Sequence, residues 1–497
     1  MLKKAVRVLT IISVATIVTI TGTMPVYASV TAIKKISASS NAIFGNGNSI
    51  HSDISSDGRY VAFTSSANNL VPGDNNNTDD IFVYDREVDQ IEMVYLHGSG
   101  TEGNNNSSFP SSSSDGRYIA FESSASNLVE GDTNGYTDIF VYDQDINQVE
   151  RVSISSAGAQ ANSYSGAVSI SSNGRYVAFQ SNATNLVPND TNGYRDIFVY
   201  DRNTDTIERV SLSSSGTQGN NSSSSPNISA DGRYVAFVSA ATNLVTGDTN
   251  GYEDIFVYDR NTDTIERVNL SSGGVQANNN SAGPSISADG RYVAFDSSAS
   301  NLVPNDTNNK TDVFVYDRNT DTIERVSISS NGAQANNSSN IGYTNSSRIS
   351  SDGRYVTFSS YASNLVANDT NGTSDVFLYD RNNDTIERVS ISTGGTQGNG
   401  ISIYSSMSSD GRFIVFNSNA TNLVTGDTNG FTDVFVHDVL NNTTQRVTIT
   451  PSGTEGNGAS MYGSISSNGA YVAFTSRATN FVPGNVYMHI FVTTVTY

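Results

Sequence analysis

The chain repeats itself eight times at an almost constant spacing. Each repeat carries an Asp-Gly or Asn-Gly pair, which serves as its anchor. The anchors begin at Asp57, Asp115, Asn173, Asp231, Asp289, Asp352, Asp410 and Asn468. Successive anchors are 58 residues apart, except for the step from Asp289 to Asp352, which is 63. A strict long period indicates one supersecondary unit stacked on copies of itself. The repeat therefore constrains the fold far more tightly than it constrains the function.

One repeat reads as four short strands, and it shows no helical periodicity. In the repeat around Asp231, the expected strands are 227–229, 234–238, 255–259 and 264–268. The second and third strands are apolar throughout, which indicates burial on both faces, whereas the fourth alternates and is expected to be half exposed. Four antiparallel strands of this kind are typical of a propeller blade. A β-helix is the main alternative, but its repeats are much shorter and its rungs carry no four-stranded meander.

The two ends of the repeat array complement each other. Residues 33–37 stand where a fourth strand belongs, and residues 490–492 stand where a third strand belongs. The N-terminal strand is therefore expected to complete the last blade, which removes an open sheet edge. The predicted fold is all-β: an eight-bladed β-propeller with four antiparallel strands per blade, closed by the N-terminal strand. Residues 29–497 are expected to form this single domain.

The repeat resembles that of a known family. The segment from Ile228 to Phe237 (ISADGRYVAF), followed by Asp254 to Asp259 (DIFVYD), is similar to the TolB-type, WD40-like propeller repeat. The same repeat occurs in the propellers of prolyl oligopeptidase-like and tricorn-type proteases. The chain differs from TolB in having eight units instead of six, and it is expected to lack both TolB's separate N-terminal domain and any appended hydrolase domain. The resemblance implies an exported binding or scaffold propeller.

Residues 1–28 have the pattern of a signal peptide. A basic segment from Lys3 to Arg7 precedes a short apolar run from Val8 to Ile20, and Ala28 ends a small-residue cleavage site. The apolar run is too short to make a good membrane span. The mature chain is therefore expected to be exported to the periplasm, the cell surface or the medium, without membrane insertion after cleavage.

Composition narrows the partners of the chain. It contains no Cys, so its stability cannot come from a disulfide framework. Its 48 acidic and 27 basic residues give a net charge of −21, which repels phosphate backbones. Nucleic acid is thus not expected as a partner. A protein or a polysaccharide is expected instead, and the chain is expected to be a monomer.

The loop between the second and third strands of a repeat carries a recurrent acidic pattern. Each copy has an Asp, an Asn two residues later, and a second Asp four residues after the Asn. The copies are Asp132, Asn134, Asp138; Asp190, Asn192, Asp196; Asp248, Asn250, Asp254; Asp306, Asn308, Asp312; Asp369, Asn371, Asp375; and Asp427, Asn429, Asp433. Asp74, Asn76 and Asp80 begin the series, and the eighth repeat has lost it.

Two carboxylates and an amide oxygen near a glycine suit a hard cation such as Ca²⁺. The six full copies are therefore the predicted metal ligands, although the pattern lacks the further oxygen ligands of an EF-hand loop. The alternative is structural, because Asn-Gly favours a hairpin turn and Asp side chains bond to their own backbone in loops. No cofactor is required by the sequence, and Ca²⁺ is the one that it suggests.

The innermost strands differ from one another where the rest of the repeat agrees. Six residues before the anchors stand His51, Phe109, Ala167, Ser225, Gly283, Ser346, Tyr404 and Tyr462. The bulky residues fall on blades one, two, seven and eight, which are adjacent in a closed ring. A five-residue insertion adds Tyr343 and Arg348 on blade six, beside them. An aromatic crescent at a channel mouth can stack on sugars or hold a peptide. The predicted ligand-binding residues are therefore His51, Phe109, Tyr343, Arg348, Tyr404 and Tyr462; the alternative is that they are packing variants at blade junctions.

The same strands offer little for catalysis. They read Ser-Ile-Ser at 169–171 and at 285–287, and Asp53 is the exceptional acid. The four His residues are scattered, and no Ser has a paired base in the pattern. The predicted function is a non-catalytic binding or scaffold module that uses its loop-rich face. The alternative is a calcium-stabilised carbohydrate-active enzyme, which requires carboxylates that converge in the channel.

Overall fold

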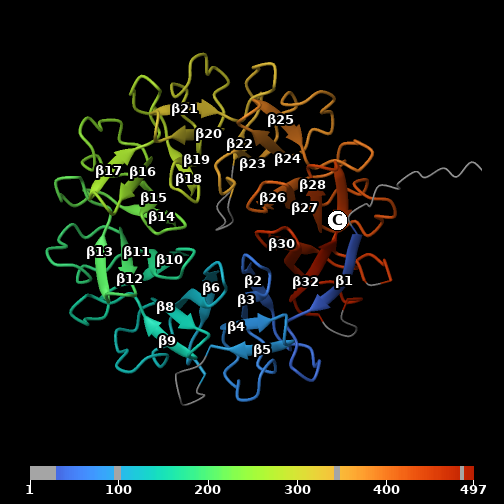
Figure 1. Ribbon diagram of the computed structural model, residues 1–497, viewed down its shortest axis with the longest axis horizontal. Helices are drawn as coiled ribbons and strands as arrows, with labels where there is room; N and C mark the ends of the chain where they lie inside the picture. Colours follow the sequence, from blue (N-terminus) through green and yellow to red (C-terminus); the bar gives the residue numbers. More distant parts are fainter. Residues whose placement is uncertain (1–28, 95–101, 341–347, 451, 482–485, 497) are drawn as a thin grey trace, which may run out of the picture.

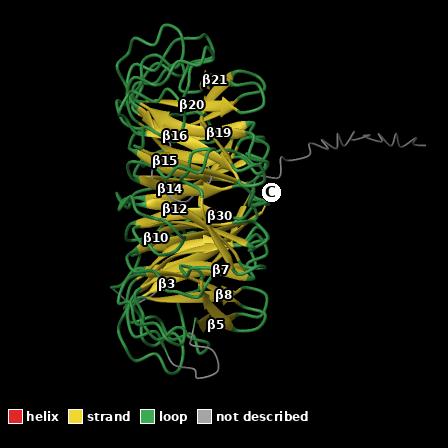
Figure 2. Ribbon diagram, turned by 90° about the vertical axis from the view of Figure 1, so that its left-hand side faces the viewer, coloured by secondary structure: helices red, strands yellow, loops and turns green. Residues whose placement is uncertain are grey.

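The chain folds into a ring of eight four-stranded antiparallel sheets around a central axis (Figure 1). The computed structural model describes residues 29–94, 102–340, 348–450, 452–481 and 486–496. Seen from the side, the sheets stand next to one another in a flat disc, with loops on both faces (Figure 2). The predicted eight-bladed propeller is confirmed. The described residues contain no helix of the length and apolarity that a membrane crossing requires.

Seven blades consist of consecutive strands, which follow one another from the axis outwards. Blade one contains β2 (Ser49–Ile54), β3 (Tyr60–Ser65), β4 (Asp80–Asp85) and β5 (Gln90–Met93). Blade two contains β6 (Ser107–Ser112), β7 (Tyr118–Ser123), β8 (Asp138–Asp143) and β9 (Gln148–Arg151). Blade three contains β10 (Ser165–Ile170), β11 (Tyr176–Ser181), β12 (Asp196–Asp201) and β13 (Thr206–Arg209). Blade four contains β14 (Ser223–Ile228), β15 (Tyr234–Ser239), β16 (Asp254–Asp259) and β17 (Thr264–Arg267).

The second half of the ring repeats this order. Blade five contains β18 (Ser281–Ile286), β19 (Tyr292–Ser297), β20 (Asp312–Asp317) and β21 (Thr322–Arg325). Blade six contains β22 (Ser339–Asn340), β23 (Tyr355–Ser360), β24 (Asp375–Asp380) and β25 (Thr385–Arg388). Blade seven contains β26 (Ser402–Met407), β27 (Phe413–Ser418), β28 (Asp433–Asp438) and β29 (Thr443–Arg446).

The last blade joins the two ends of the described chain. Its strands are β30 (Ser460–Ile465), β31 (Tyr471–Ser476), β32 (His489–Thr496) and, outermost, β1 (Ser29–Lys35). β1 pairs with β32 in an antiparallel register that runs from Ser29 opposite Thr496 to Lys35 opposite Phe491. The Ile36 N–H continues this pairing by donating to the Ile490 carbonyl at 3.0 Å. The predicted closure by the N-terminal strand is therefore confirmed.

The hydrophobic core lies between neighbouring blades. In every blade a Phe of the second strand stacks on a Phe of the third, as Phe237 does on Phe256 at 5.9 Å between ring centroids. These rings are buried because the faces of each sheet are covered by the sheets on either side. One core cluster, for example, combines Ile197 and Val199 of blade three with Phe237 of blade four. Burial on both faces explains why the second and third strands are apolar throughout.

In seven of the eight blades the innermost strand is longer than the sequence indicates and contains a β-bulge; the exception is β22 of blade six, which is described over two residues. In blade four, β14 starts at Ser223, and its register with β15 shifts between Ser224 and Asn227. Ser225 lies in this bulge with a φ of +55°. An extra residue in one strand bends that strand and re-aims its side chains. The described positions six residues before the anchors, in all blades but the sixth, are therefore bulge positions.

The anchor turns link the blades to one another. Ser229 and the N–H of Arg233 both donate to the Asp231 carboxylate, at 2.6 and 2.9 Å, which fixes the turn. The N–H of Ala230 donates to the Ala288 carbonyl of the next blade at 3.1 Å, and equivalent bonds connect blades one through eight. Gly290 adopts a φ of +72°, and a Cβ at this position would lie 2.0 Å from Cδ2 of Tyr234 in the preceding blade. Glycine is thus required by both the backbone and the neighbour.

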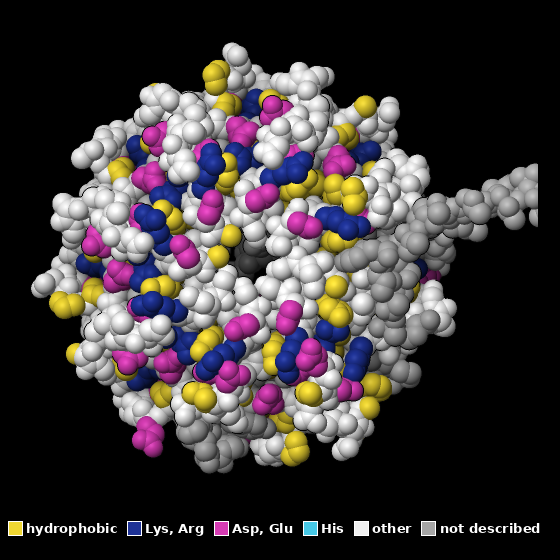
Figure 3. Space-filling model, in the orientation of Figure 1, with side chains coloured by type: hydrophobic (Ala, Val, Ile, Leu, Met, Phe, Trp, Pro, Cys, Tyr) yellow, Lys and Arg dark blue, Asp and Glu magenta, His cyan; other side chains and the backbone are white. Residues whose placement is uncertain are grey.

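One face of the disc carries a ring of ion pairs. Arg233 binds Asp259 in a bidentate pair with distances of 2.8 and 2.7 Å. Arg260 binds Glu208 of the preceding blade at 2.6 Å and lies over the ring of Tyr176. The Arg–Asp pair recurs in blades one to seven, and the Arg–Glu pair is found at four blade junctions. Basic and acidic side chains are accordingly spread around the central opening (Figure 3). The charged side chains on this face therefore also connect neighbouring blades.

Candidate functional site

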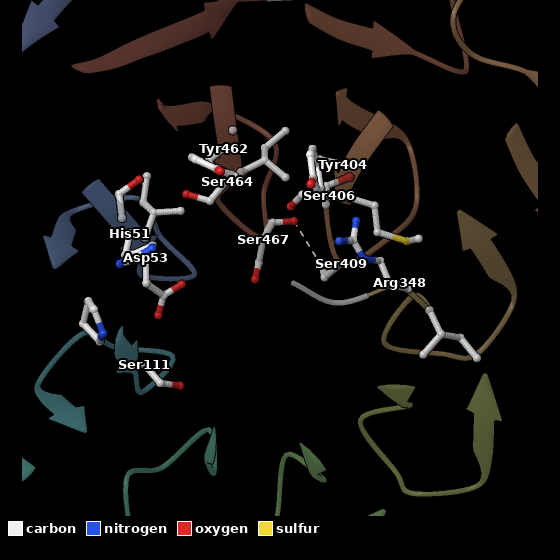
Figure 4. A pocket seen from close by; sticks show the side chains of 18 of the residues that line it. His51, Asp53, Ser111, Arg348, Tyr404, Ser406, Ser409, Tyr462, Ser464 and Ser467 are labelled. Atoms are coloured by element: carbon white, nitrogen blue, oxygen red, sulfur yellow. Dashed lines mark hydrogen bonds between the residues drawn. The ribbon is translucent and has the colours of Figure 1, made fainter. Parts of the chain in front are cut away.

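A cavity of about 480 Å³ lies among the innermost strands of the ring. Its walls come from the innermost strands of blades one, two, seven and eight and from the segment of blade six that begins at Arg348. Figure 4 shows the labelled side chains arranged around one opening, with Asp53 and Arg348 on different sides of it. A cavity of this size lies within the range of small-molecule sites. We therefore treat it as the candidate ligand site.

Four aromatic rings from four blades line this cavity. His51 stacks on Phe109 with 4.4 Å between ring centroids, and Tyr404 lies 5.9 Å from Tyr462. Phe109, Tyr404 and Tyr462 are 44, 42 and 39% exposed, so their faces are open to solvent. These rings, together with Arg348, were predicted as ligand-binding residues, and the structure brings them together. Tyr343, the remaining predicted member, lies outside the described residues.

Among the bulge positions that the structure describes, the aromatic residues fall on one side of the channel. The equivalent bulge positions of blades three, four and five hold Ala167, Ser225 and Gly283, all with positive φ. The side chain of Glu122 supports one of these bulges, because its Oε1 accepts the N–H of Ala167 at 2.7 Å. Burial raises the pKa of Glu122.

A ring of polar side chains comes from the positions four residues before the anchors. Its members are Asp53, Ser111, Ser169, Asn227, Ser285, Arg348, Ser406 and Ser464. Most are small hydroxyl groups, so the one carboxylate and the one guanidinium are the charged exceptions. Several of these side chains accept a backbone N–H of the next blade, as Asn227 does from Ile286 at 3.0 Å. The ring thus combines a structural role with a polar channel wall.

The two charged members of this ring are strongly desolvated. Asp53 accepts the N–H of Ser112 at 2.7 Å, and burial raises its pKa. Arg348 donates from Nη1 to Ser405 Oγ at 3.4 Å, and burial lowers its pKa to about 10. Asp53 was recognised in the sequence as an unusual acid but was not predicted to bind ligand. Asp53 and Arg348 occupy the same position of the repeat, four residues before the anchor, and this shared position could have identified Asp53 from the sequence.

The predicted calcium loops hold arginine side chains. In blade four, Arg267 Nη1 lies 3.0 Å from Asp248 Oδ1 and 3.1 Å from Asp254 Oδ2, and all three side chains are buried. Asn250 Nδ2 donates to Asp254 and to the Ala277 carbonyl. The same arrangement recurs in six blades, around Arg151, Arg209, Arg267, Arg325, Arg388 and Arg446.

An arginine therefore occupies the place between each pair of carboxylates where a cation was predicted. The guanidinium neutralises part of the negative charge of the two carboxylates. The Asn side chain connects the loop to the segment that leads to the next blade through its hydrogen bond to a backbone carbonyl. Calcium binding by these six loops stays a prediction. As they stand, the described residues contain no group of three or more His, Cys, Asp or Glu side chains gathered for a metal ion.

The Arg267→Met variant is expected to be destabilised by about 3–5 kcal/mol, because it leaves Asp248 and Asp254 buried without their counter-charge. Chemical denaturation of wild type and variant measures this difference. Glu87→Gln is the control, since it removes an exposed pair with Arg59 at 3.3 Å. Such a pair is worth less than about 1 kcal/mol. A loss for Arg267→Met as small as that of the control would contradict a stabilising role for the buried arginines.

No protein-family model matches the chain, and no curated protein matches its sequence. Solved structures do match. One of the prolyl endopeptidases is 11% identical with a TM-score of 0.48; the match covers 87% of this chain and 55% of that one, so the chain spans about half its length. An oligogalacturonate lyase from Vibrio parahaemolyticus is 13% identical over 90% of this chain and 98% of that one, with a TM-score of 0.44. A putative TolB from Agrobacterium tumefaciens is 18% identical over 56% of this chain and 80% of that one, with a TM-score of 0.33. These likenesses concern the propeller fold and carry no information about activity.

Proposed function

We propose that the protein is an exported, non-catalytic binding module that holds a carbohydrate chain at the aromatic side of its central channel. The observation that supports this proposal is the convergence of four rings, from four blades, on one cavity with a polar wall. The blades repeat almost identically, and the blades without an aromatic residue at this position pack in the same way. Packing therefore does not require aromatic residues on one side of the axis.

The chemistry of the cavity suits a sugar. Half-exposed aromatic faces can stack on the apolar face of a pyranose ring. The hydroxyl groups of the polar ring, such as those of Ser111 and Ser406, can exchange hydrogen bonds with sugar hydroxyls. Arg348 and Asp53 then fix the orientation of the chain. The net charge of −21 disfavours strongly anionic polymers such as nucleic acids.

Asp53 favours a second candidate function, a carbohydrate-active enzyme. A carboxyl group whose pKa is raised by burial is suited to act as a general acid. A glycosidase pair needs a second carboxylate, and among the described residues that line the cavity Asp53 is the one acid. Release of reducing ends from a bound polysaccharide, abolished in Asp53→Asn, would establish this function in place of simple binding.

The Tyr404→Ala and Tyr462→Ala variants are expected to weaken polysaccharide binding about tenfold or more, as removal of a central aromatic contact does at binding sites. The measurement is affinity electrophoresis or calorimetry with a panel of glucans, mannans, chitin oligomers and polyuronates. Tyr194→Ala is the matched control, because Tyr194 is 42% exposed, like Tyr404, and does not line the cavity.

Unchanged melting temperatures of all three variants are needed for this comparison. The proposal fails if the wild-type protein binds none of the polysaccharides. It also fails if Tyr194→Ala loses as much binding as the two channel variants.

A further inference from the structure

Blade one departs from the arginine arrangement of the six blades that follow it. It keeps the acidic loop, with Asp74 and Asp80 in the positions of Asp248 and Asp254. Its outer strand β5, however, ends in Met93 where β17 ends in Arg267. Met93 is 1% exposed, so an uncharged side chain fills the buried position. The two carboxylates of blade one are therefore deprived of the cation that their counterparts contact.

A third carboxylate joins this loop. Glu102 stands where blade four has Gln276, whose side-chain oxygen accepts both the Thr249 N–H and the Arg267 guanidinium. Glu102 Oε2 likewise accepts the N–H of Asn75, at 2.5 Å. Glutamate thus takes the place of a neutral amide in the blade that lost its arginine.

Blade seven also has a glutamate at this position, Glu455. It retains its arginine, however, and Arg446 Nη1 lies 3.2 Å from Glu455. The combination of three acids with no arginine is therefore particular to blade one among the blades whose acidic loop is described.

The buried acid of blade one lacks a partner for part of its carboxylate. Asp80 is 2% exposed, and its Oδ2 accepts no hydrogen bond. Burial, together with the charge of Asp74, raises the pKa of Asp80 to about 8. Burial and the charge of Glu102 raise the pKa of Asp74 to about 6. Among the described residues, no Lys, Arg or His forms an ion pair with any of the three acids. A buried carboxyl group of this kind is costly to ionise unless a cation reaches it.

We propose that blade one binds a calcium ion between Asp74, Asp80 and Glu102, in the place that arginine takes in the other blades. The net charges of the two arrangements agree. One guanidinium with two carboxylates has a net charge of −1, and one Ca²⁺ with three carboxylates also has a net charge of −1. Ca²⁺ prefers oxygen ligands in a flexible arrangement, and loop backbone and water can supply the remaining positions. The described residues include no group of three or more His, Cys, Asp or Glu side chains already placed to hold a metal ion, so the proposed site requires the Glu102 side chain to approach Asp80.

The experiment uses the full chain after removal of metals with a chelator. Calorimetric titration with CaCl₂ is expected to show one site per chain, and millimolar Ca²⁺ is expected to raise the melting temperature by mass action. MgCl₂ is expected to bind at least tenfold more weakly. Absence of Ca²⁺ binding at millimolar concentration, or an equal response to Mg²⁺, would overturn the proposal.

Three variants locate the ion. Met93→Arg installs the internal cation of the other blades and is expected to melt in chelator no lower than wild type, without any response to Ca²⁺. Asp80→Asn removes one ligand and is expected to lose Ca²⁺ binding even if Met93→Arg fails to fold. Met93→Leu preserves the apolar side chain and is expected to bind Ca²⁺ as wild type does. Retention of the same stoichiometry in both Met93→Arg and Asp80→Asn would place the ion elsewhere and overturn the proposal.

Discussion

A chain that begins at Ile36, and therefore lacks β1, is expected to melt on the order of 10 °C below the chain that begins at Ser29, and to aggregate. Removal of β1 leaves the backbone groups of β32 unpaired along one edge. It also uncovers Ile490 and Val492, which are buried in the closed ring. An open apolar edge is a template for pairing with other chains. Thermal melting and size-exclusion chromatography measure both effects.

The chain that begins at Ser29 is the control for this truncation. It lacks only residues 1–28, which lie outside the described structure. It is expected to stay monomeric and to melt like the longer chain. If both truncated chains melt at the same temperature, β1 does not close the ring in solution, and the closed propeller is wrong as a description of the stable protein.

The Gly290→Ala variant is expected to lose about 3–5 kcal/mol of unfolding free energy, the sum of a positive-φ cost and a clash in a packed junction. The added Cβ would lie 2.0 Å from Tyr234 Cδ2, and that ring is held between two blades. Neither the turn nor the ring can move without disturbing the hydrogen bonds that connect the blades. Denaturant unfolding monitored by fluorescence of the tyrosines measures the loss.

Gly251→Ala separates the two contributions. Gly251 has a φ of +70°, close to that of Gly290, but a Cβ there would meet nothing within 4 Å. This variant is expected to lose only the conformational part, on the order of 1 kcal/mol. Equal losses for the two variants would show that the contact with the neighbouring blade does not contribute to the requirement for glycine.

The strict period makes the architecture predictable from the sequence. Eight anchors define eight blades, and the complementary ends of the array define the closure, because each blade needs four strands. The aromatic crescent is predictable for a related reason. Against a constant repeat, His51, Phe109, Tyr404 and Tyr462 are visible as exceptions, and ring closure makes their blades neighbours. The structure confirms that these side chains line one cavity.

The arginine between the acidic pairs was missed, because its partners are distant in sequence. Arg267 ends a strand that alternates and is half exposed, as predicted, yet its side chain lies on the buried side of that strand. It reaches Asp248 and Asp254 across the edge of the blade, 19 and 13 residues away. The loop sequence alone shows two carboxylates without a counter-charge and therefore suggests a metal ion. In the folded chain, the counter-charge is the guanidinium of an arginine from the outer strand. The presence of Met93 where other blades have arginine is informative only once the contact between that arginine and the two carboxylates is known.

The bulges of the innermost strands were also missed, because no residue type marks them. Their occupants include histidine, phenylalanine, tyrosine, alanine, serine and glycine, all held at positive φ by the pairing on either side. The backbone of the innermost strands fixes the position of each of these side chains, but it does not restrict the residue type. Exchange of these few residues can therefore alter the chemical preference of the pore while the surrounding architecture remains intact, so related chains with the same blades can serve different ligands.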